Sequence, residues 1–287
     1  GIIVYRVNPV YKDEGNLRGN DYIYVDCFSQ QVDSPEALAV ELSDRHFGVG
    51  GDGVVLIGPS NVADARMRTY NRDGSEGLMG GNAIRCVGNY LHDARRVNKL
   101  HLTIETASGL RQLRLVTKNG QVIRVEVDMG RAELEPAKIP VALDGGRVVD
   151  RAVDLAGAAR RITCVSVGNP HCVLFDQNVD GLDVDAVGPL IEYDPLFPER
   201  VNVEFVQPVN AHTLKMRVWE RGSGETWACG TGACAAVVAA VENGLCPAGE
   251  TVRVMVRGGD LFVRYLTDGS VFLMGDAQKI YEGDIEI

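Results

Sequence analysis

Short apolar or alternating runs recur along the chain, separated by glycine, aspartate and asparagine. Residues 54–57 (VVLI) are wholly apolar, whereas residues 121–127 (QVIRVEV) and 251–256 (TVRVMV) alternate apolar with polar side chains. Alternation with a period of two is typical of a strand with one buried face, and a short apolar run between turn residues is typical of a fully buried strand. Residues 270–274 (SVFLM) follow the same pattern. The chain is therefore predicted to be rich in β-structure.

Two segments depart from this pattern and predict helices. The first takes Asn82 as its N-cap and continues to about residue 94. The second begins after Gly230 and continues to residue 241, before a stop signal at residues 243–244 (NG). Small residues occupy several sides of both segments. A helix that is small and apolar all round is usually buried, so we expect one prominent central helix in each part of the chain.

Two glycine-rich segments resemble each other at a fixed distance along the chain. Residues 71–86 (NRDGSEGLMGGNAIRC) and 220–235 (ERGSGETWACGTGACA) share an arginine, a glutamate and a glycine at an offset of 149 residues. A second pair keeps that offset: Gly-Asn precedes the apolar residues 22–25 and also precedes residues 171–175. Two separate motifs in one register predict two homologous halves related by a pseudo-twofold axis.

The predicted fold class is α/β, more narrowly α+β, with two pseudo-symmetric domains. Each domain is expected to be a curved mixed β-sheet wrapped around its central helix. We expect the N-terminal half-domain to comprise residues 1–128 plus 275–287 and the C-terminal half-domain to comprise residues 129–274. The active site is expected in the cleft between them.

Composition and charge narrow the class of function. The 287 residues are 45% hydrophobic and 24% charged, as in ordinary globular proteins, which argues against a disordered or fibrous chain. A net charge of −10 repels phosphate backbones and argues against a general nucleic-acid binder. No run reaches the roughly 18 apolar residues of a membrane span, and charged residues interrupt any signal-peptide core. We therefore expect a soluble, cytoplasmic protein with no nucleic-acid or membrane partner.

The seven cysteines do not form a recognisable framework. They occur at positions 27, 86, 164, 172, 229, 234 and 246, without the closely spaced pairs that zinc sites show. We expect neither a disulfide scaffold nor a metal site. Most of the seven are expected to be buried filler.

The paired loop-to-helix junctions predict a site for a carboxylate. Free backbone N–H groups and the positive end of a helix dipole favour an anion, and glycine lets the backbone approach it closely. Cys229 lies at the second junction, where the dipole and nearby cations are expected to lower the thiol pKa. A thiolate beside a bound carboxylate could remove the proton from the adjacent carbon, because the amides stabilise the enolate-like charge that develops.

Motifs spread over nearly the whole chain resemble those of diaminopimelate epimerases. They are NxDGSE from Asn71, MxGN from Met79, GNPH from Gly168, VN from Val201, ERG from Glu220, ACGTG from Ala228 and GGDL from Gly258. The resemblance implies a cofactor-free epimerase in which two cysteines exchange the α-proton on opposite faces of the substrate. It also implies interconversion of LL- and meso-diaminopimelate for lysine and peptidoglycan precursor synthesis, and a homodimer.

The resemblance also assigns site residues. Cys229 would be one catalytic thiol, with His171 and Glu220 tuning the thiols. Arg221 suits a bidentate grip on the distal carboxylate of the substrate, and Glu220 suits its distal ammonium. The complete substrate-binding set implied is Asn20, Asn71, Gly81, Asn82, Asn169, Asn202, Glu220, Arg221, Gly230 and Thr231, with the amides of Gly81, Asn82, Gly230 and Thr231 at the reacting carboxylate.

One departure from the family pattern concerns the first catalytic cysteine, whose place is taken by Gly80. Cys86 lies six residues further on, roughly 9 Å along a helix, which is too far to replace it. Glycine holds no proton, and losing a positioned acid or base typically removes about 10²–10⁴-fold of rate. The sequence therefore predicts a weak or inactive epimerase. Gly53 also stands where many relatives carry a side-chain amide.

Other functions remain open at this point. One is a one-base relative, a racemase or dehydratase acting on another amino acid; another is a non-catalytic amino-acid-binding protein. Residues 48–53 fit the GxGxxG pattern, but a strand is predicted after them, where a dinucleotide fingerprint needs a helix. No lysine lies in a context that indicates a pyridoxal enzyme, so no cofactor is expected.

Overall fold

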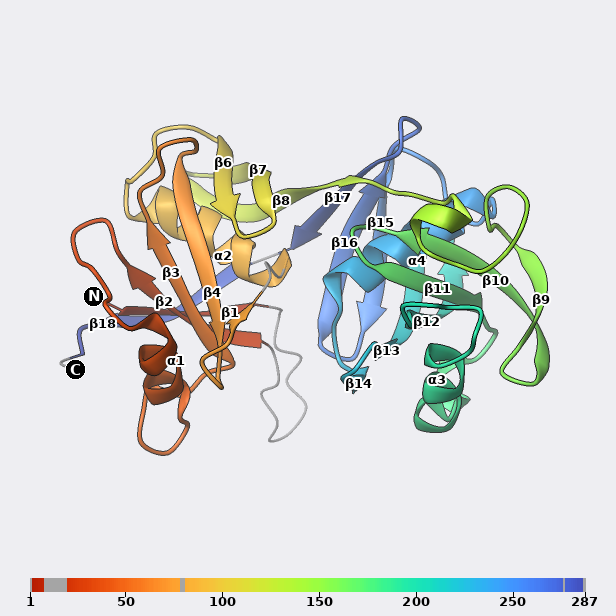
Figure 1. Cartoon of the computed structure of the whole chain (residues 1–287). Helices are drawn as coiled ribbons and strands as arrows, with labels where there is room; N and C mark the ends of the chain where they lie inside the picture. The colour runs from red at the N-terminus through yellow and green to blue at the C-terminus, as the bar shows by residue number, and fades with distance from the viewer. Residues whose placement is uncertain (1, 8–19, 78–80, 276, 286–287) are drawn as a thin grey trace. The chain divides into compact units, whose positions relative to one another are not determined.

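The computed structural model describes residues 2–7, 20–77, 81–275 and 277–285. The chain divides into two compact units, one of Gly1–Asp128 with Met274–Ile287 and the other of Met129–Leu273. It crosses between them in strand β8 and again in strand β17 (Figure 1). The first unit is therefore discontinuous in sequence and the second is continuous.

Strands of the first unit surround helix α2. Its elements are β1 (Ile2–Val7), β2 (Asn20–Asp26), α1 (Pro35–Ser43), β3 (Gly53–Gly58), β4 (Ala65–Asn71), β5 (Glu76–Gly77), α2 (Gly81–Asp93), β6 (His101–Thr106), β7 (Gly109–Lys118), β8 (Gln121–Arg131) and β18 (Ala277–Gly283). Strands β2 and β3 are parallel, whereas β1 pairs antiparallel with both β2 and β18. The sheet is thus mixed, and α2 is buried from Ala83 to Leu91.

The second unit repeats this plan around helix α4. Its elements are β9 (Arg151–Leu155), β10 (Ala158–Ser166), β11 (Pro170–Phe175), α3 (Val184–Glu192), β12 (Asn202–Asn210), β13 (Thr213–Glu220), β14 (Gly224–Thr226), α4 (Gly230–Glu242), β15 (Thr251–Val256), β16 (Gly259–Tyr265) and β17 (Ser270–Gly275), with short 3₁₀ helices at Pro136–Lys138 and Val179–Gly181. The predicted α+β class, with two similar halves each wrapped around a central helix, is confirmed.

The offset seen in the sequence recurs in the strand pairing. Parallel β2 and β3 place Tyr22 opposite Gly53, and parallel β11 and β12 place His171 opposite Asn202, which lie 149 residues further on. Helices α2 and α4 also begin 149 residues apart, as do α1 and α3. Within the described residues each unit therefore carries a second α-helix besides the prominent central one predicted, and the repeat includes these helices that the sequence pattern did not reveal.

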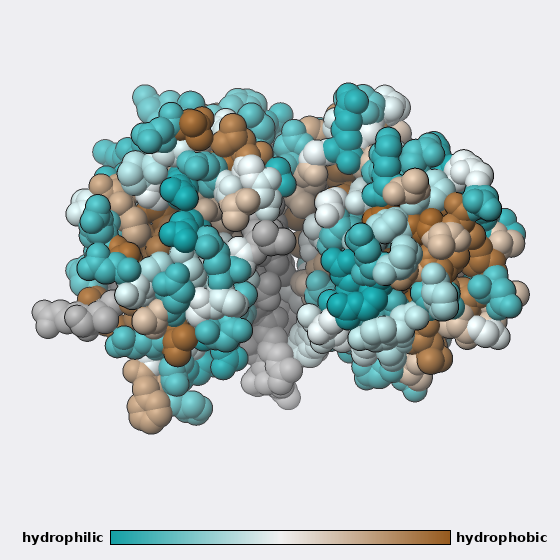
Figure 2. Space-filling model, in the orientation of Figure 1, coloured by the Kyte–Doolittle hydropathy of each residue, from teal (hydrophilic) through white to brown (hydrophobic). Residues whose placement is uncertain are grey.

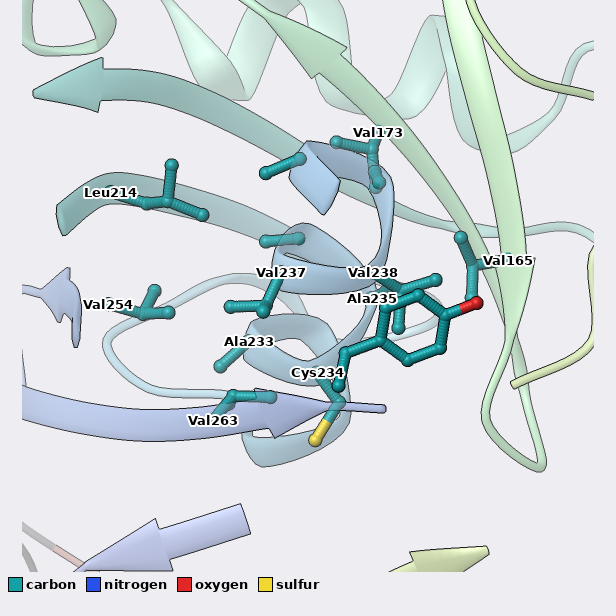
Figure 3. Packing of buried hydrophobic residues seen from close by; sticks show 14 of the residues in the cluster. Val165, Val173, Leu214, Ala233, Cys234, Ala235, Val237, Val238, Val254 and Val263 are labelled. Carbon is teal, nitrogen blue, oxygen red and sulfur yellow. The ribbon is translucent and has the colours of Figure 1, made fainter. Parts of the chain in front are cut away.

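Helix α4 is buried all round, as predicted from its small residues. Every residue from Gly232 to Ala240 is buried. Side chains from the surrounding strands pack against the helix (Figure 3); they include Val165, Val173, Leu214, Val254 and Val263. Small side chains let the strands approach the helix closely, which fixes the position of its N-terminus.

The start of α2 differs from the prediction. The helix begins at Gly81, so Asn82 lies inside its first turn and is not the N-cap. A glycine is tolerated there because the first N–H groups of a helix have no partner within the helix. The strand predicted after residues 48–53 is confirmed as β3, and no side chain fits at Gly53, where an added Cβ would lie 2.3 Å from the carbonyl oxygen of Tyr70.

Hydrophilic side chains cover much of the visible surface of both units (Figure 2). Within the described ranges of the chain, no helix combines the length and apolar character that a membrane crossing would need. The same ranges contain no cluster of three or more histidine, cysteine, aspartate or glutamate residues suited to a metal ion.

Candidate functional site

Cys229 is the N-cap residue of helix α4. Its backbone is extended, with φ −138° and ψ 112°, and its Sγ accepts a hydrogen bond from the backbone N–H of Gly232 at 3.3 Å. Serine or aspartate usually fills this role at a helix start. The hydroxyl of Thr231 lies 3.5 Å from the same sulfur. The local sequence therefore places two potential hydrogen-bond donors on the thiol.

The surroundings of Cys229 raise its pKa, and the prediction of a lowered pKa is wrong. The residue is only 7% exposed, and burial is the largest cause of the raised pKa. The charges of Glu220 and Glu204 raise the pKa further, while the hydrogen bonds from Thr231 and Gly232 oppose them. The charged neighbours of the sulfur are thus carboxylates rather than cations. At neutral pH the thiol is protonated and equipped to donate a proton.

His171 is connected to Cys229 through a short series of hydrogen bonds. Its Nε2 lies 2.9 Å from Oδ1 of Asn169, whose Nδ2 donates to Oγ1 of Thr231 at 3.3 Å. Gly168, the residue before Asn169, adopts φ +101°, a left-handed conformation that favours glycine. The Gly-Asn motif is therefore needed to aim the Asn169 amide between β11 and the start of α4.

Glu204 is a residue of this network that sequence reasoning missed. Its Oε1 lies 2.6 Å from Nδ1 of His171, and both side chains are completely buried. Burial raises the pKa of Glu204, the neighbouring His171 lowers it, and the charge of Glu220 raises it. The available signal was a charged residue two positions after Asn202, directly between the apolar residues Val203 and Phe205.

Asn202 and Arg221 are brought together at the turn that follows β13. The Asn202 side chain donates to the carbonyl oxygen of Pro170 at 3.0 Å and accepts from the backbone N–H of Arg221 at 2.8 Å. Both ends of its amide are thus engaged by the protein. The guanidinium of Arg221 donates to the carbonyl oxygen of Glu199 at 2.9 Å.

Glu192, on α3, braces the same turn. Its carboxylate is 2% exposed and accepts hydrogen bonds from the Trp219 indole at 2.7 Å, the Gly222 backbone at 3.0 Å and the Arg200 guanidinium at 3.1 Å. Glu220 is half-buried on β13, and no hydrogen bond to its carboxylate occurs within the described ranges. The turn thus presents Glu220 on a rigid support.

The remaining candidates belong to the other unit. Asn71 ends β4, is exposed, and donates from Nδ2 to Ser75 Oγ at 3.0 Å. The backbone of Asn20 begins β2, and that of Gly81 and Asn82 begins α2. The side chains of Asn20 and Asn82, and Gly80 altogether, lie outside the described residues. Cys86 is completely buried in α2, where burial raises its pKa to about 12, consistent with the view that it does not replace a catalytic thiol.

The family model that matches this chain and the similar curated proteins carry the same description. A family model described as diaminopimelate epimerase matches residues 10–135 and 163–280. Diaminopimelate epimerase from Acetivibrio thermocellus is 48% identical over 270 residues, covering 94% of this chain and 96% of that protein. The enzyme of the same name from Methanococcus maripaludis is 46% identical, covering 94% of this chain and 97% of that protein.

Solved structures support the fold at lower identity. A predicted epimerase from Pseudomonas aeruginosa matches with a TM-score of 0.63 and 22% identity, over 99% of this chain and 98% of that one. A methylitaconate-delta-isomerase matches with a TM-score of 0.68 and 16% identity, over 98% of this chain and 94% of that one. At these identities the likeness concerns the fold alone.

Proposed function

We propose, because this chain belongs to the diaminopimelate epimerase family, that it is an isomerase interconverting LL- and meso-diaminopimelate without a cofactor. The observation that carries the proposal is the 44–48% identity to proteins of that name along 93–94% of the chain. In this role the enzyme would serve lysine and peptidoglycan precursor synthesis. Its small-molecule substrate is an amino acid with a carboxylate beside the reacting carbon.

Cys229 is the proton carrier on one face of the substrate in this proposal. Its raised pKa keeps the thiol protonated in the free enzyme, so the thiol can donate a proton to the α-carbon once a base on the opposite face has removed the proton that this carbon already carries. The thiolate that remains is then stabilised by the Gly232 N–H and the Thr231 hydroxyl. His171 and Glu220 adjust the charge around the sulfur. For the reverse reaction the same thiolate would remove the proton.

The reacting carboxylate would bind at the start of α4. No backbone hydrogen bond from the N–H groups of Gly230 or Thr231 occurs among the described residues, as expected for the first turn of a helix. These two groups and the helix dipole favour an anion. They also stabilise the enolate-like charge that develops when the α-proton leaves. The distal groups of the substrate would contact Glu220 and Arg221.

Residues of the first unit would complete the site. By the family motif, Asn20, Asn71, Gly81 and Asn82 would contribute to substrate binding there, alongside Asn169 and Asn202 from the second unit. The sequence motifs support this arrangement. Alanine substitution of Asn71, compared with substitution of the exposed Asn210, would test it: the proposal expects a raised KM for Asn71→Ala alone.

Because residue 80 is glycine, we expect proton transfer on only one face of the substrate. Glycine cannot carry a proton, so the face opposite Cys229 lacks its acid or base, and we propose that epimerisation is slow. A second candidate follows from the same glycine: a one-base enzyme in which the thiolate form of Cys229 alone exchanges the α-hydrogen of one stereoisomer or eliminates a β-substituent.

The decisive experiment follows α-hydrogen exchange in heavy water by NMR, with LL- and meso-diaminopimelate supplied separately. We expect the chain as it stands to label one stereoisomer with little interconversion, and Gly80→Cys to raise epimerisation by at least about 10²-fold. Cys229→Ala should abolish exchange in the chain as it stands and abolish epimerisation in the Gly80→Cys background, where the new cysteine alone would exchange only the hydrogen of the other stereoisomer. Equal epimerisation by the chain and its Gly80→Cys variant would refute the impairment; tight binding with no exchange would favour a non-catalytic binding protein.

Assembly and location form a further part of the proposal. The family resemblance supports a homodimer and a cytoplasmic location. Analytical ultracentrifugation of the purified chain at several concentrations would test the dimer, and fractionation of the source cells would test the location. A monomer at micromolar concentration, or recovery in the membrane fraction, would contradict them.

A further inference from the structure

Glu204 is a buried carboxyl group to which the proposed mechanism gives no role. Neither its side chain nor that of His171 has any exposed surface, and Oε2 of Glu204 has no hydrogen-bond partner among the described residues. Burying a carboxyl group costs free energy unless it is paired and hydrogen-bonded. The side-chain group that pairs with this carboxyl within the described ranges is Nδ1 of His171, at 2.6 Å. The pair therefore needs an explanation beyond packing.

The hydrogen bonds beyond His171 have a definite direction. An amide oxygen only accepts, so the 2.9 Å contact with Asn169 Oδ1 requires that Nε2 of His171 carries the hydrogen. The Asn169 Nδ2 group then donates to Thr231 Oγ1 at 3.3 Å. This leaves the hydroxyl hydrogen of Thr231 free to point at Cys229 Sγ, 3.5 Å away. Each donor in the series therefore points to the next member, and the last one points at Cys229 Sγ.

We propose that Glu204 is a positioning residue for Cys229: by holding Nδ1 of His171, it fixes the direction of a hydrogen-bond series that ends with a hydroxyl donor on the sulfur. One proton lies between Nδ1 and Oε1, and Nε2 keeps its hydrogen whether that proton resides on the histidine or on the glutamate. The inference rests on the proposed function for what the thiol does to a substrate. The network itself lies within Met129–Leu273 and exists without substrate.

The competing explanation is that Glu204 acts only as a nearby negative charge. The titratable groups around it are His171 and Cys172 on β11, Glu220 on β13 and Cys229 on α4. As a mere charge, Glu204 would disfavour the thiolate, and any neutral replacement would make Cys229 more reactive. As a positioning residue it favours the thiolate through Thr231. The two explanations predict opposite signs.

The test measures iodoacetamide labelling of Cys229 at pH 8.5, without substrate, by peptide mass spectrometry. Glu204→Leu removes the group that holds Nδ1, and we expect about tenfold slower labelling. Glu204→Gln retains an N–H donor for Nδ1, and labelling should stay within about twofold of the unchanged chain. Thr231→Val should also slow labelling, and adding Glu204→Leu to it should have no further effect, because both changes break one series.

Faster labelling in Glu204→Leu or Glu204→Gln would overturn the proposal, as would additive effects in the double variant. Thr163→Val removes another buried hydroxyl of the same unit and should leave the labelling rate unchanged. If Glu204→Leu does not fold, Glu204→Gln still decides through the sign of its effect, and ¹⁵N NMR of the His171 ring should show hydrogen on Nε2. A chain that fails to epimerise diaminopimelate would leave these readouts intact, so the two proposals fail separately.

Discussion

Cys229 and Cys234 lie on the same helix but differ in their surroundings. Cys234 faces the packed core of the second unit (Figure 3), and burial raises its pKa to about 12. Cys229 is also buried, but carboxylates raise its pKa while a hydroxyl and a backbone N–H oppose the rise. The neighbours of Cys229 that affect its pKa are thus polar groups, which substitution can change, whereas those of Cys234 are packed apolar side chains. A thiol with such partners is adjustable, whereas a core thiol is inert.

The charge of Glu220 supplies the first prediction. Since this carboxylate raises the pKa of Cys229, its removal in Glu220→Gln should lower that pKa. More thiolate is then present at a given pH, so iodoacetamide labelling of Cys229 at pH 8.5 should become faster by about two- to tenfold. Glu250→Gln removes an exposed carboxylate paired with His212 and provides the control. Slower labelling in Glu220→Gln would contradict the electrostatic account.

Two equivalent ion pairs give a matched comparison of burial. Arg217 and Glu225 are 9% and 11% exposed and joined at 2.7 Å, whereas their counterparts Arg68 and Glu76, 149 residues earlier, are 38% and 43% exposed and joined at 3.0 Å. Arg217 also donates to two backbone carbonyls. We expect Arg217→Gln to lower the free energy of unfolding by about 3–5 kcal/mol and Arg68→Gln by about 0–1 kcal/mol.

Urea denaturation of both arginine variants, followed by circular dichroism, checks this difference. The sequence repeat pairs the two arginines, so the comparison holds residue type and strand position constant while burial changes. Equal losses in the two variants would show that burial does not set the strength of these pairs.

Two glycines at the start of helix α4 differ in the space around them. A Cβ at Gly232 would lie 2.9 Å from Glu204 Oε1 and 3.2 Å from Cys229 Sγ, whereas a Cβ at Gly230 would meet only the end of the Leu273 side chain, at 2.9 Å. Alanine favours a helix over glycine by about 1 kcal/mol. That gain should prevail in Gly230→Ala, because a leucine methyl can move.

In Gly232→Ala the buried carboxyl and the thiol cannot both move away, so we expect a net loss of stability of about 1–3 kcal/mol and a displaced sulfur. Thermal unfolding of the two variants, with labelling of Cys229, measures both effects. A Gly232→Ala variant as stable as Gly230→Ala would mean that the start of the helix yields more readily than its packing indicates.

Among the helices and strands, those with a strong hydrophobic pattern could be predicted from the sequence. The strand expected at residues 251–256 is β15 (Thr251–Val256), and the second central helix ends beside Asn243 and Gly244 as expected. Helix α3 was missed because Gly188 and Pro189 lie inside it, and both disfavour helix. A nine-residue helix is stabilised by packing rather than by propensity, which local pattern does not report.

The chemistry of the candidate site was harder to predict than its position in the chain. The sequence indicates that Cys229 starts a helix, and a helix start alone favours the thiolate. Which charges lie nearby depends on the fold of β12 and β13, which carry Glu204 and Glu220 and whose pairing no local sequence pattern reports. The direction of the pKa shift of Cys229 therefore depends on tertiary structure. His171 and Asn169 could be selected from their motif, but Glu204 belongs to no motif.

At the scale of the whole molecule, buried thiols in both units predict loss of stability in alkali. Burial raises the pKa of Cys86 and of Cys234 from 9.0 to about 12. In the unfolded chain these thiols ionise near pH 9, while in the folded chain they keep their protons until about pH 12. The free energy of unfolding should therefore fall as pH rises from 9 to 12, by up to about 1.4 kcal/mol per pH unit for each thiol.

Urea denaturation at several pH values between 8 and 11 measures this slope, and Cys86→Ala with Cys234→Ala should reduce it. Alanine leaves small cavities, so the slope rather than the absolute stability is the relevant quantity. A slope unchanged by both substitutions would assign the alkaline loss to other buried groups, such as Tyr265, whose pKa is also raised to about 12.

The first unit is discontinuous in sequence and the second is continuous, which leads to a prediction about fragments of the chain. Both hydrophobic clusters of the second unit draw all their residues from Met129–Leu273, so a fragment of residues 129–273 contains its complete core. The first unit depends on the C-terminal segment, because β1 pairs with β18 along six residue pairs.

We expect fragment 129–273 to unfold cooperatively in urea and fragment 1–128 to lack a cooperative transition, since it leaves an unpaired strand edge. Adding a peptide of residues 274–287 to fragment 1–128 should restore part of its structure. Noncooperative unfolding of fragment 129–273 would show that the second unit needs the first for its stability, and the thiol network could then not be studied in isolation.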